Sequence, residues 1–397
     1  MKIYNHFIPR LLLRQFACTD TKINIFRFAT EEFITCKLKK AFAEKDIYDE
    51  DLEAAFNIKL EGAFADLLNH RLLQGDTITI DREENFLIRK FLLINSLRNP
   101  ISNKTFEEKV SITQSEDHPV VLKYRRMKEL YPEFADVFDM IDSSNEAYVS
   151  NMKKAIEIKN TEEFMDVAWG EERYTPLSMM AQYSIVPVIA FWDCEDTGQE
   201  FILPKLTGIS YMDNVDGGNT QGNVELPYKV RVLNDVIEKM EHNLYPIHMI
   251  LWRGELGRML QGSLVFPDNF SIFPISPTRV LVFISPYFRG FYPIMDENGQ
   301  KPICPPLLTK EQFDRHFWKK MRMDLLKPCG NVKNQKYTYQ VRKLDLDEVF
   351  FINAMVLNME TQEFAFHDYN KIRDSLRYYD NVAKFAMPKR HDFSRWG

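Results

Sequence analysis

The chain has 397 residues, of which 45% are hydrophobic, 13% aromatic and 27% charged. This is ordinary globular composition, with enough aromatic side chains for a sizeable core. The formal net charge of -6 excludes a globally basic nucleic-acid binder, so any contact with nucleic acid must come from a local patch.

The five cysteines are scattered, and no two of them have the CxxC spacing of a zinc site or a redox motif. Their odd number and wide spread indicate reduced thiols in a cytoplasmic protein, not a disulfide scaffold. No apolar run approaches the roughly 18 residues of a membrane-spanning helix, so we expect no membrane partner. Because no P-loop, GxSxG or GxGxxG motif occurs, we expect no cofactor.

The most informative stretch lies almost at the start of the chain, at residues 5–16 (NHFIPRLLLRQF). It holds an imidazole, two guanidinium groups, two carboxamides and a proline among large apolar side chains. This mixture is typical of a buried polar cluster and not of a frayed terminus. The acid-free first nineteen residues are also typical of a transit peptide, but Pro9 interrupts the amphipathic helix that such a peptide needs. We therefore expect a folded N-terminus.

The next elements follow from hydrophobic periodicity. Residues 22–28 alternate polar and apolar, as a half-buried strand does, and residues 30–36 can pair with them as a hairpin. Acidic residues at 49–51 open a helix whose apolar stripe continues to Leu67, with Glu61 beside that stripe.

Helices are also predicted over most of the following hundred residues. Asp81 is expected to cap a central, largely buried helix that Pro100 ends. Charged amphipathic segments fill residues 101–170, and the last of them is a short helix that we expect Thr161 to cap.

The second half of the chain is richer in strand signals. We expect a strand over 185–192 and another at 201–203, after a turn. The apolar run at 280–284 is the strongest buried-strand signal in the chain. A helix over 346–359 and a short strand at 364–366 follow.

Together these elements predict one α+β domain over residues 1–383. In it, a helical N-terminal layer (roughly 45–170) packs on a mixed or antiparallel sheet contributed largely by the C-terminal half (roughly 180–290), which the N-terminal strand 22–28 joins. Residues 384–397 form a basic tail that we expect to be loose.

The opening pattern N-H-F-I-P-R-x-x-L-R-x-F resembles the start of a bacterial family known as domain of unknown function 4238. That family then shows a strand, a helix with a Glu, an apolar helix ending in R-[TN]-P, an S-D-N stretch, a PLSP turn before an apolar strand, and an Asn near the last helix. The resemblance covers most of the chain and implies no particular activity, because the family has no settled one. The corresponding segments here are 23–28, Glu61, 97–100, the degenerate 201–205, 273–279 leading into 280–284, and Asn353.

His6 is the leading candidate for chemistry, because an imidazole can act as acid or base near neutral pH. Arg10 and Arg98 can bind a phosphate group or stabilise an oxyanion. Glu61, on an apolar helix face, needs a partner, and it can orient His6 from there. We therefore predict a catalytic set of His6, Glu61 and Arg98 and a ligand-binding set of Asn5, Arg10 and Arg279.

Each of these candidates has a structural alternative. Asn5 and His6 can satisfy backbone groups around Pro9, and Glu61 with Arg98 can form a plain strut between two helices. A metal held by His6, Glu61 and either Asp81 or Asp268 matches no known spacing, so we expect no metal.

The sequence favours a hydrolase that acts on a phosphate-containing small molecule or on nucleic acid, although whether the protein is an enzyme at all stays open. Basic stretches with interleaved aromatic residues, as at 336–342 and 377–379, can bind single strands but are more often solvated surfaces. The alternative is a non-catalytic binding or regulatory module whose N-terminal motif is structural.

Overall fold

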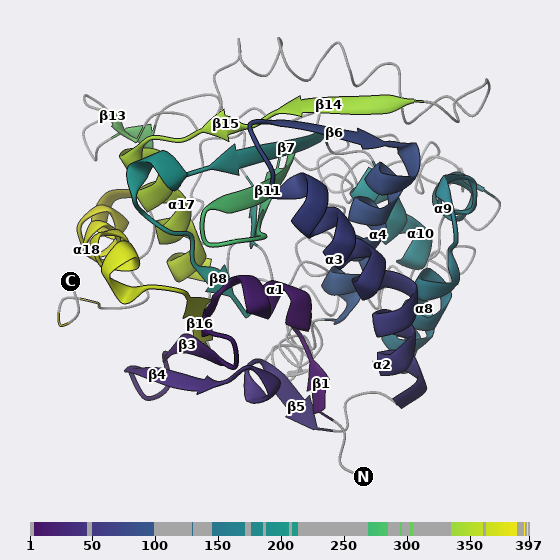
Figure 1. The fold of residues 1–397 in the computed structure, drawn as a ribbon, viewed down its shortest axis with the longest axis horizontal. Helices are drawn as coiled ribbons and strands as arrows, with labels where there is room; N and C mark the ends of the chain where they lie inside the picture. The colour runs from purple at the N-terminus through teal and green to yellow at the C-terminus, as the bar shows by residue number, and fades with distance from the viewer. Residues whose placement is uncertain are drawn as a thin grey trace. The chain divides into compact units, whose positions relative to one another are not determined.

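The chain has an α+β fold, as predicted (Figure 1). It divides into two compact units. The first unit comprises residues 1–91, 187–215 and 268–397, and the second comprises 92–186 and 216–267. One continuous domain over 1–383, with a helical layer on a sheet, stays a prediction. The computed structural model describes residues 4–45, 50–98, 129, 145–170, 176–185, 188–205, 209–212, 269–284, 294–295, 302–304, 335–359, 363–386, 393 and 395.

A five-stranded sheet in the first unit is built entirely from residues 188–343. Its strand order is β15-β7-β11-β10-β9, with β15 parallel to β7 and the other neighbours antiparallel. The apolar run predicted as a buried strand forms the middle of this sheet, and Val280, Leu281 and Val282 are completely buried there. The strands are β7 (Val188–Asp193), β9 (Ile209–Met212), β10 (Asn269–Pro274), β11 (Arg279–Ile284) and β15 (Arg342–Lys343).

The second sheet joins the two ends of the chain. Its central strand β3 pairs antiparallel with β4, which confirms the predicted hairpin, and also with β2 and β16. In place of the strand expected at 201–203, the structure has β8, which is shorter, begins later in the chain and pairs with β16. The strands are β2 (Ala17–Thr19), β3 (Lys22–Arg27), β4 (Glu32–Lys37), β8 (Leu203–Pro204) and β16 (Glu363–Phe366).

Three two-stranded antiparallel ribbons account for the remaining strands in the described part of this unit. The ribbon of β6 and β14 was not predicted, although both strands alternate more and less buried residues. The stretch considered as a basic, aromatic binding segment is largely the strand β14 of this ribbon. The ribbons are β1 (Tyr4–His6) with β5 (Ala43–Lys45), β6 (Thr77–Asp81) with β14 (Lys336–Gln340), and β12 (Ile294–Met295) with β13 (Pro302–Cys304).

The early helices bury the predicted apolar stripe, and the last of them, α4, begins in the first unit and ends in the second. The ring of Phe64 stacks on that of Phe91 with centroids 3.6 Å apart. Asp81 caps α4 as predicted, because its side chain accepts from the backbone N–H of Glu84 while Glu84 accepts from the N–H of Asp81, each at 2.8 Å. These helices are α1 (Arg10–Gln15), α2 (Glu50–Phe56), the π-helical η2 (Asn57–Glu61), α3 (Gly62–Leu67), the π-helical η3 (Leu68–Leu72) and α4 (Arg82–Arg98).

Two C-terminal helices lie side by side in the first unit (Figure 1). α17 (Leu346–Met359) has the predicted bounds, whereas α18 (Tyr369–Ala386) was not predicted. Beyond α18, Phe393 is buried among aromatic rings that include Phe26 and Tyr379, so the expectation of a loose tail is wrong at this residue. Burial of Tyr379 also removes its ring from any role in stacking on a nucleic-acid base.

The second unit is helical in its described part. It contains α8 (Asn145–Glu157), α9 (Thr161–Trp169) and α10 (Pro176–Ile185), and α10 contacts both of the others. The predicted cap of α9 is corrected: Asn160, and not Thr161, accepts from the N–H of Glu163 at 2.9 Å. Helices expected between 101 and 144 lie outside the described residues.

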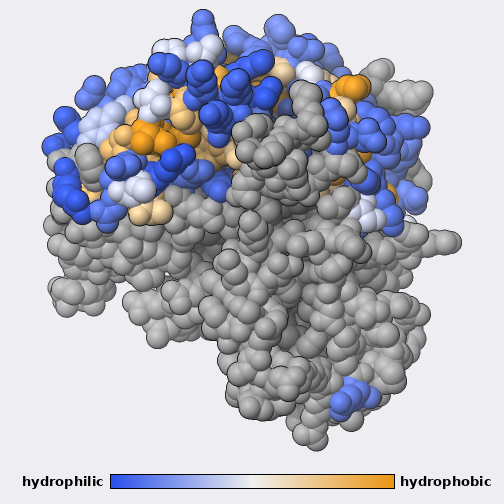
Figure 2. Space-filling view, turned by 90° about the horizontal axis from the view of Figure 1, so that it is seen from below, coloured by the Kyte–Doolittle hydropathy of each residue, from blue (hydrophilic) through white to orange (hydrophobic). Residues whose placement is uncertain are grey.

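Hydrophilic side chains cover most of the described surface seen in Figure 2, with smaller hydrophobic areas among them. No helix in the described parts of the chain combines the length and the apolar character that a membrane span requires.

Candidate functional site

The N-terminal motif is folded inward and not frayed. Asn5 and His6 belong to β1, which pairs with β5, and the N–H of Phe7 continues this pairing by donating to the carbonyl of Phe42 at 2.9 Å. Pro9 is the N-cap residue of α1, and its carbonyl accepts from the N–H groups of Leu12 and Leu13. Asn5 and His6 are 0% and 1% exposed, so the segment contributes polar groups to the interior of its unit.

The structure describes a direct contact between two of the predicted site residues. The Nε of Arg10 donates to the Nε2 of His6 at 3.5 Å. A guanidinium group can only donate, so this bond requires Nε2 to be the unprotonated nitrogen of a neutral imidazole. Arg10 itself is exposed, in the first turn of α1. A buried imidazole therefore contacts the Nε of an exposed guanidinium group.

The other two predicted catalytic residues are placed less completely. Glu61 ends the π-helical segment η2 and is buried, as its position beside the apolar stripe predicts. Arg98 is the last residue of α4 and belongs to the second unit, and its side chain lies outside the described residues. A catalytic group of His6, Glu61 and Arg98 stays a prediction.

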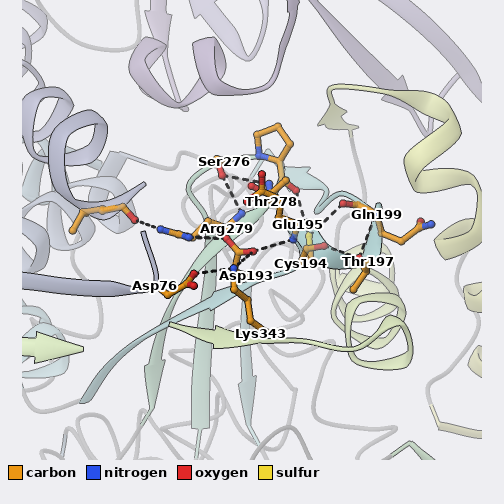
Figure 3. Close-up of polar contacts among 12 residues, drawn as sticks. Asp76, Asp193, Cys194, Glu195, Thr197, Gln199, Ser276, Thr278, Arg279 and Lys343 are labelled. Atoms are coloured by element: carbon orange, nitrogen blue, oxygen red, sulfur yellow. Dashed lines mark hydrogen bonds and ion pairs between the residues drawn. The ribbon is translucent and has the colours of Figure 1, made fainter. Parts of the chain in front are cut away.

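The predicted ligand residue Arg279 lies in a cluster of ion pairs in which Arg279 and Asp193 are buried (Figure 3). Its Nε and Nη2 both donate to one carboxylate oxygen of Asp193, at 3.0 and 2.8 Å, and its Nη1 donates to the carbonyl of Leu72 at 3.0 Å. Lys343 bridges the other oxygen of Asp193, at 3.3 Å, and Asp76, at 3.0 Å. All three donor nitrogens of Arg279 thus contact protein groups, which gives this residue a structural role in joining β11 to β7 and η3.

The same contacts set the charge states of Asp193 and Lys343. Burial raises the pKa of Asp193, but the Glu195 N–H, the Arg279 guanidinium and the Lys343 ammonium together outweigh it, so that the pKa of this carboxyl lies below its ordinary value. The hydrogen bond to Asp76 is the main reason why the pKa of Lys343 is raised. Both groups therefore stay charged at neutral pH.

A short turn before β11 holds the backbone next to the ion pairs. The Ser276 hydroxyl accepts from the N–H groups of Thr278 and Arg279, at 3.3 and 2.9 Å, and the carbonyl of Thr278 accepts from the N–H of Cys194 at 2.9 Å. Burial is the main cause of a strongly raised pKa for the Cys194 thiol, which Asp193 raises further. A thiol held protonated in this way is a poor nucleophile.

A polar cluster that the sequence did not predict surrounds Glu200, which is 2% exposed. Its Oε1 lies 3.2 Å from the Nδ1 of His367 and 3.1 Å from the Nζ of Lys371, and its Oε2 accepts from the N–H of Asp368 at 2.9 Å. In the sequence, this cluster could have been suspected only from His367 and Lys371, which lie four residues apart around the start of α18. Their partner is more than 160 residues away in sequence and nothing local marks it.

Asn353, noted only through the family resemblance, explains how this cluster is held. It is completely buried in α17, donates to the carbonyl of Glu200 at 2.8 Å and to the hydroxyl of Ser375 at 2.9 Å, and accepts from the N–H of Ile202 at 3.1 Å. One carboxamide therefore fastens α17 to α18 and to the segment that carries Glu200.

Nothing in the described residues forms a group of three or more His, Cys, Asp or Glu side chains that could hold a metal ion. The alternative metal site considered from the sequence consisted of His6, Glu61 and either Asp81 or Asp268. Of these four residues, Asp268 lies outside the described residues.

Comparison with known proteins gives a family and no activity. No curated protein and no solved structure matches the chain. Residues 4–190, the part that contains the opening motif, match the model of the family described as Protein of unknown function (DUF4238), which confirms the family resemblance predicted from the sequence.

Proposed function

We propose that this protein binds a phosphate-containing ligand through Arg10, and that His6 positions this arginine. The single observation that carries the proposal is the 3.5 Å contact between the Nε of the exposed Arg10 and the Nε2 of the buried His6. An arginine fixed through Nε keeps its two outer nitrogens in the fork geometry that matches phosphate oxygens. Pre-orientation of the side chain lowers the entropy lost on binding.

The same contact supports a binding role for the motif better than a catalytic one. A general base needs a free lone pair within reach of the substrate. The lone pair of His6 Nε2 accepts from Arg10, and the ring is 1% exposed. Hydrolysis with His6 as acid or base would require this bond to open first. The structural alternative, in which Asn5 and His6 anchor the N-terminal segment, fits their burial directly.

Ligand-induced stabilisation tests the proposal. Thermal melting of the full chain is measured with inorganic phosphate, ATP and a short single-stranded RNA, since a phosphate group is common to all three. A ligand at about 100 times its Kd stabilises the fold by about 2.7 kcal/mol, which shifts the melting temperature by several degrees. A shift with phosphate or ATP indicates a small-molecule ligand, and a shift with RNA alone indicates nucleic acid.

Two arginines of α1 provide matched variants. Arg10→Ala is expected to abolish the shift, and Arg10→Lys to weaken it, because lysine keeps the charge and loses the fork. Arg14→Ala removes an equal charge from an exposed residue one turn later and should keep the shift. If none of the three ligands stabilises the wild type, or if Arg14→Ala and Arg10→Ala lose the shift equally, the assignment to Arg10 is wrong.

A further inference from the structure

His367 and Lys371 share one oxygen of a buried carboxylate. The Nδ1 of His367 and the Nζ of Lys371 lie 3.2 and 3.1 Å from the Oε1 of Glu200. The side chain of Glu200 is 2% exposed, while those of His367 and Lys371 are 42% and 44% exposed. A buried anion thus holds an imidazole and an ammonium group at the surface, next to each other.

The backbone on both sides of this contact is held as well. The Glu200 N–H donates to the carbonyl of Lys371 at 3.3 Å, and the Glu200 carbonyl accepts from Asn353 at 2.8 Å. The carbonyl of His367 accepts from the side chain of Asn24, in β3, at 2.9 Å. The imidazole is therefore oriented by fixed groups and not by a mobile loop.

This arrangement selects one tautomer of the ring. An ionised carboxylate can only accept, so Nδ1 of His367 carries the hydrogen and Nε2 of the neutral ring carries the free lone pair. Carboxylates that orient imidazoles in this way are a recurrent feature of proton-transfer sites. His70 is a natural comparison, because its exposed ring contacts a backbone carbonyl, that of Asp66, at 2.9 Å.

We propose that His367 is the proton-transfer residue of a site that acts on phosphate esters, with Glu200 as its positioning residue and Lys371 as the group that binds the phosphate. This goes beyond the binding role proposed for Arg10 and does not depend on it.

The proposed step balances without a further reactant. A water molecule gives a proton to Nε2 of His367 while its oxygen bonds to phosphorus. The bond from phosphorus to the leaving oxygen breaks, the electron pair stays with that oxygen, and the imidazolium returns the proton to it. One ester and one water become one phosphate and one alcohol.

Lys371 suits the task of holding the negative charge. The hydrogen bond to Glu200 and its charge raise the pKa of this ammonium group, so that it stays protonated at neutral pH. An ammonium group has three N–H donors, and its contact with Glu200 leaves donors for phosphate oxygens. It lies beside the imidazole because both bind the same carboxylate oxygen.

Hydrolysis of p-nitrophenyl phosphate by the full chain, with EDTA present, tests the proposal, and p-nitrophenyl acetate is the neutral comparison. We expect turnover of the phosphate ester that His367→Gln lowers by at least about 100-fold. Glu200→Gln should lower it by about 10-fold, as loss of an orienting carboxylate does. Lys371→Met should raise KM for the phosphate ester and leave the acetate unaffected. His70→Gln should retain the wild-type rate.

A second measurement needs no variant and so does not depend on folding of Glu200→Gln. Nitrogen-15 NMR of the histidine side chains reports which ring nitrogen carries the hydrogen. The Nδ1–H tautomer is expected for His367, and the Nε2–H tautomer would overturn the proposal. Absence of phosphate-ester turnover by the wild type, or full turnover by His367→Gln, would overturn it too.

Discussion

Arg279 and Asp193 form an ion pair at 2.8 Å with side chains that are 5% and 1% exposed. A buried charge is tolerated only when it is paired and hydrogen-bonded, and here each partner has several such bonds. In the sequence, Arg279 is a charged residue directly before a buried strand, and we predicted that it binds a ligand. Its partner Asp193 is 86 positions away, so only the fold shows where the guanidinium bonds go.

Removal of one charge from this pair is expected to be costly. Asp193→Asn should lower the free energy of unfolding by about 3–5 kcal/mol, because Arg279 stays buried without its counter-charge. Asp76→Asn is the matched control: it removes an ion pair with Lys343 from a carboxylate that is 70% exposed, and should cost no more than about 1 kcal/mol. Urea unfolding measures both values, and equal losses would contradict a buried pair.

The same variant should change the response to acid. The pKa of Asp193 is lowered in the fold, so its contribution to stability is complete above the ordinary aspartate pKa of about 4 and is lost as pH falls through the folded value. Below about pH 4 the wild type should therefore lose stability more steeply than Asp193→Asn. Unfolding free energies at pH 7 and at successively lower pH give this comparison, and parallel curves would contradict it.

At the scale of elements, local sequence rules located most helices and misassigned some ends. Asp81 and Glu84 form the reciprocal cap that their spacing predicts. α9 has the same chemistry one residue earlier than expected, since Asn160 caps it and Glu163 returns a bond to the N–H of Lys159 at 2.8 Å. Asn and Thr are both good caps, and only the backbone geometry decides between adjacent ones.

The cap of α9 gives a direct prediction. Asn160→Ala should destabilise α9 by about 1 kcal/mol, because the N–H of Glu163 loses its acceptor. Hydrogen exchange at the Glu163 amide measures this locally. Glu162→Ala, at an exposed position of the same first turn, should change exchange by only a few tenths of a kcal/mol. A larger effect at Glu162 would mean that charge, and not capping, stabilises this end.

At the scale of the whole molecule, the first unit is assembled from segments far apart in the chain. β3 near the N-terminus pairs with β16 near the C-terminus, and Phe393 packs on Phe26 and Tyr379 with ring centroids 5.4 and 5.6 Å apart. Its N–H also donates to Asp380 at 3.0 Å. The extreme C-terminal segment therefore completes a core that the first thirty residues begin.

This packing predicts that the tail matters for stability. Phe393→Ala should lower the free energy of unfolding by about 3–5 kcal/mol, through lost burial and a cavity among the neighbouring rings. Arg395→Ala, two residues later with a side chain that is 72% exposed, should cost no more than about 1 kcal/mol. Denaturant unfolding of the two variants is the measurement. If Phe393→Ala leaves the free energy of unfolding unchanged, the tail is loose, as the sequence led us to expect.

The sequence alone determined the α+β class, the hairpin of β3 and β4, the buried strand β11 and the bounds of α17, because periodicity and caps act over a few residues. It also showed the family resemblance, which the family model matches over residues 4–190. It also identified His6 and Glu61 as buried polar residues. Only the tertiary structure decided that Arg10 lies on His6, that Arg279 binds Asp193, and that Glu200 holds His367 and Lys371. The last two groups join residues 86 to more than 160 positions apart, and no local rule ranks such distant pairings. Their geometry follows from strand order and helix packing, which the whole chain settles together.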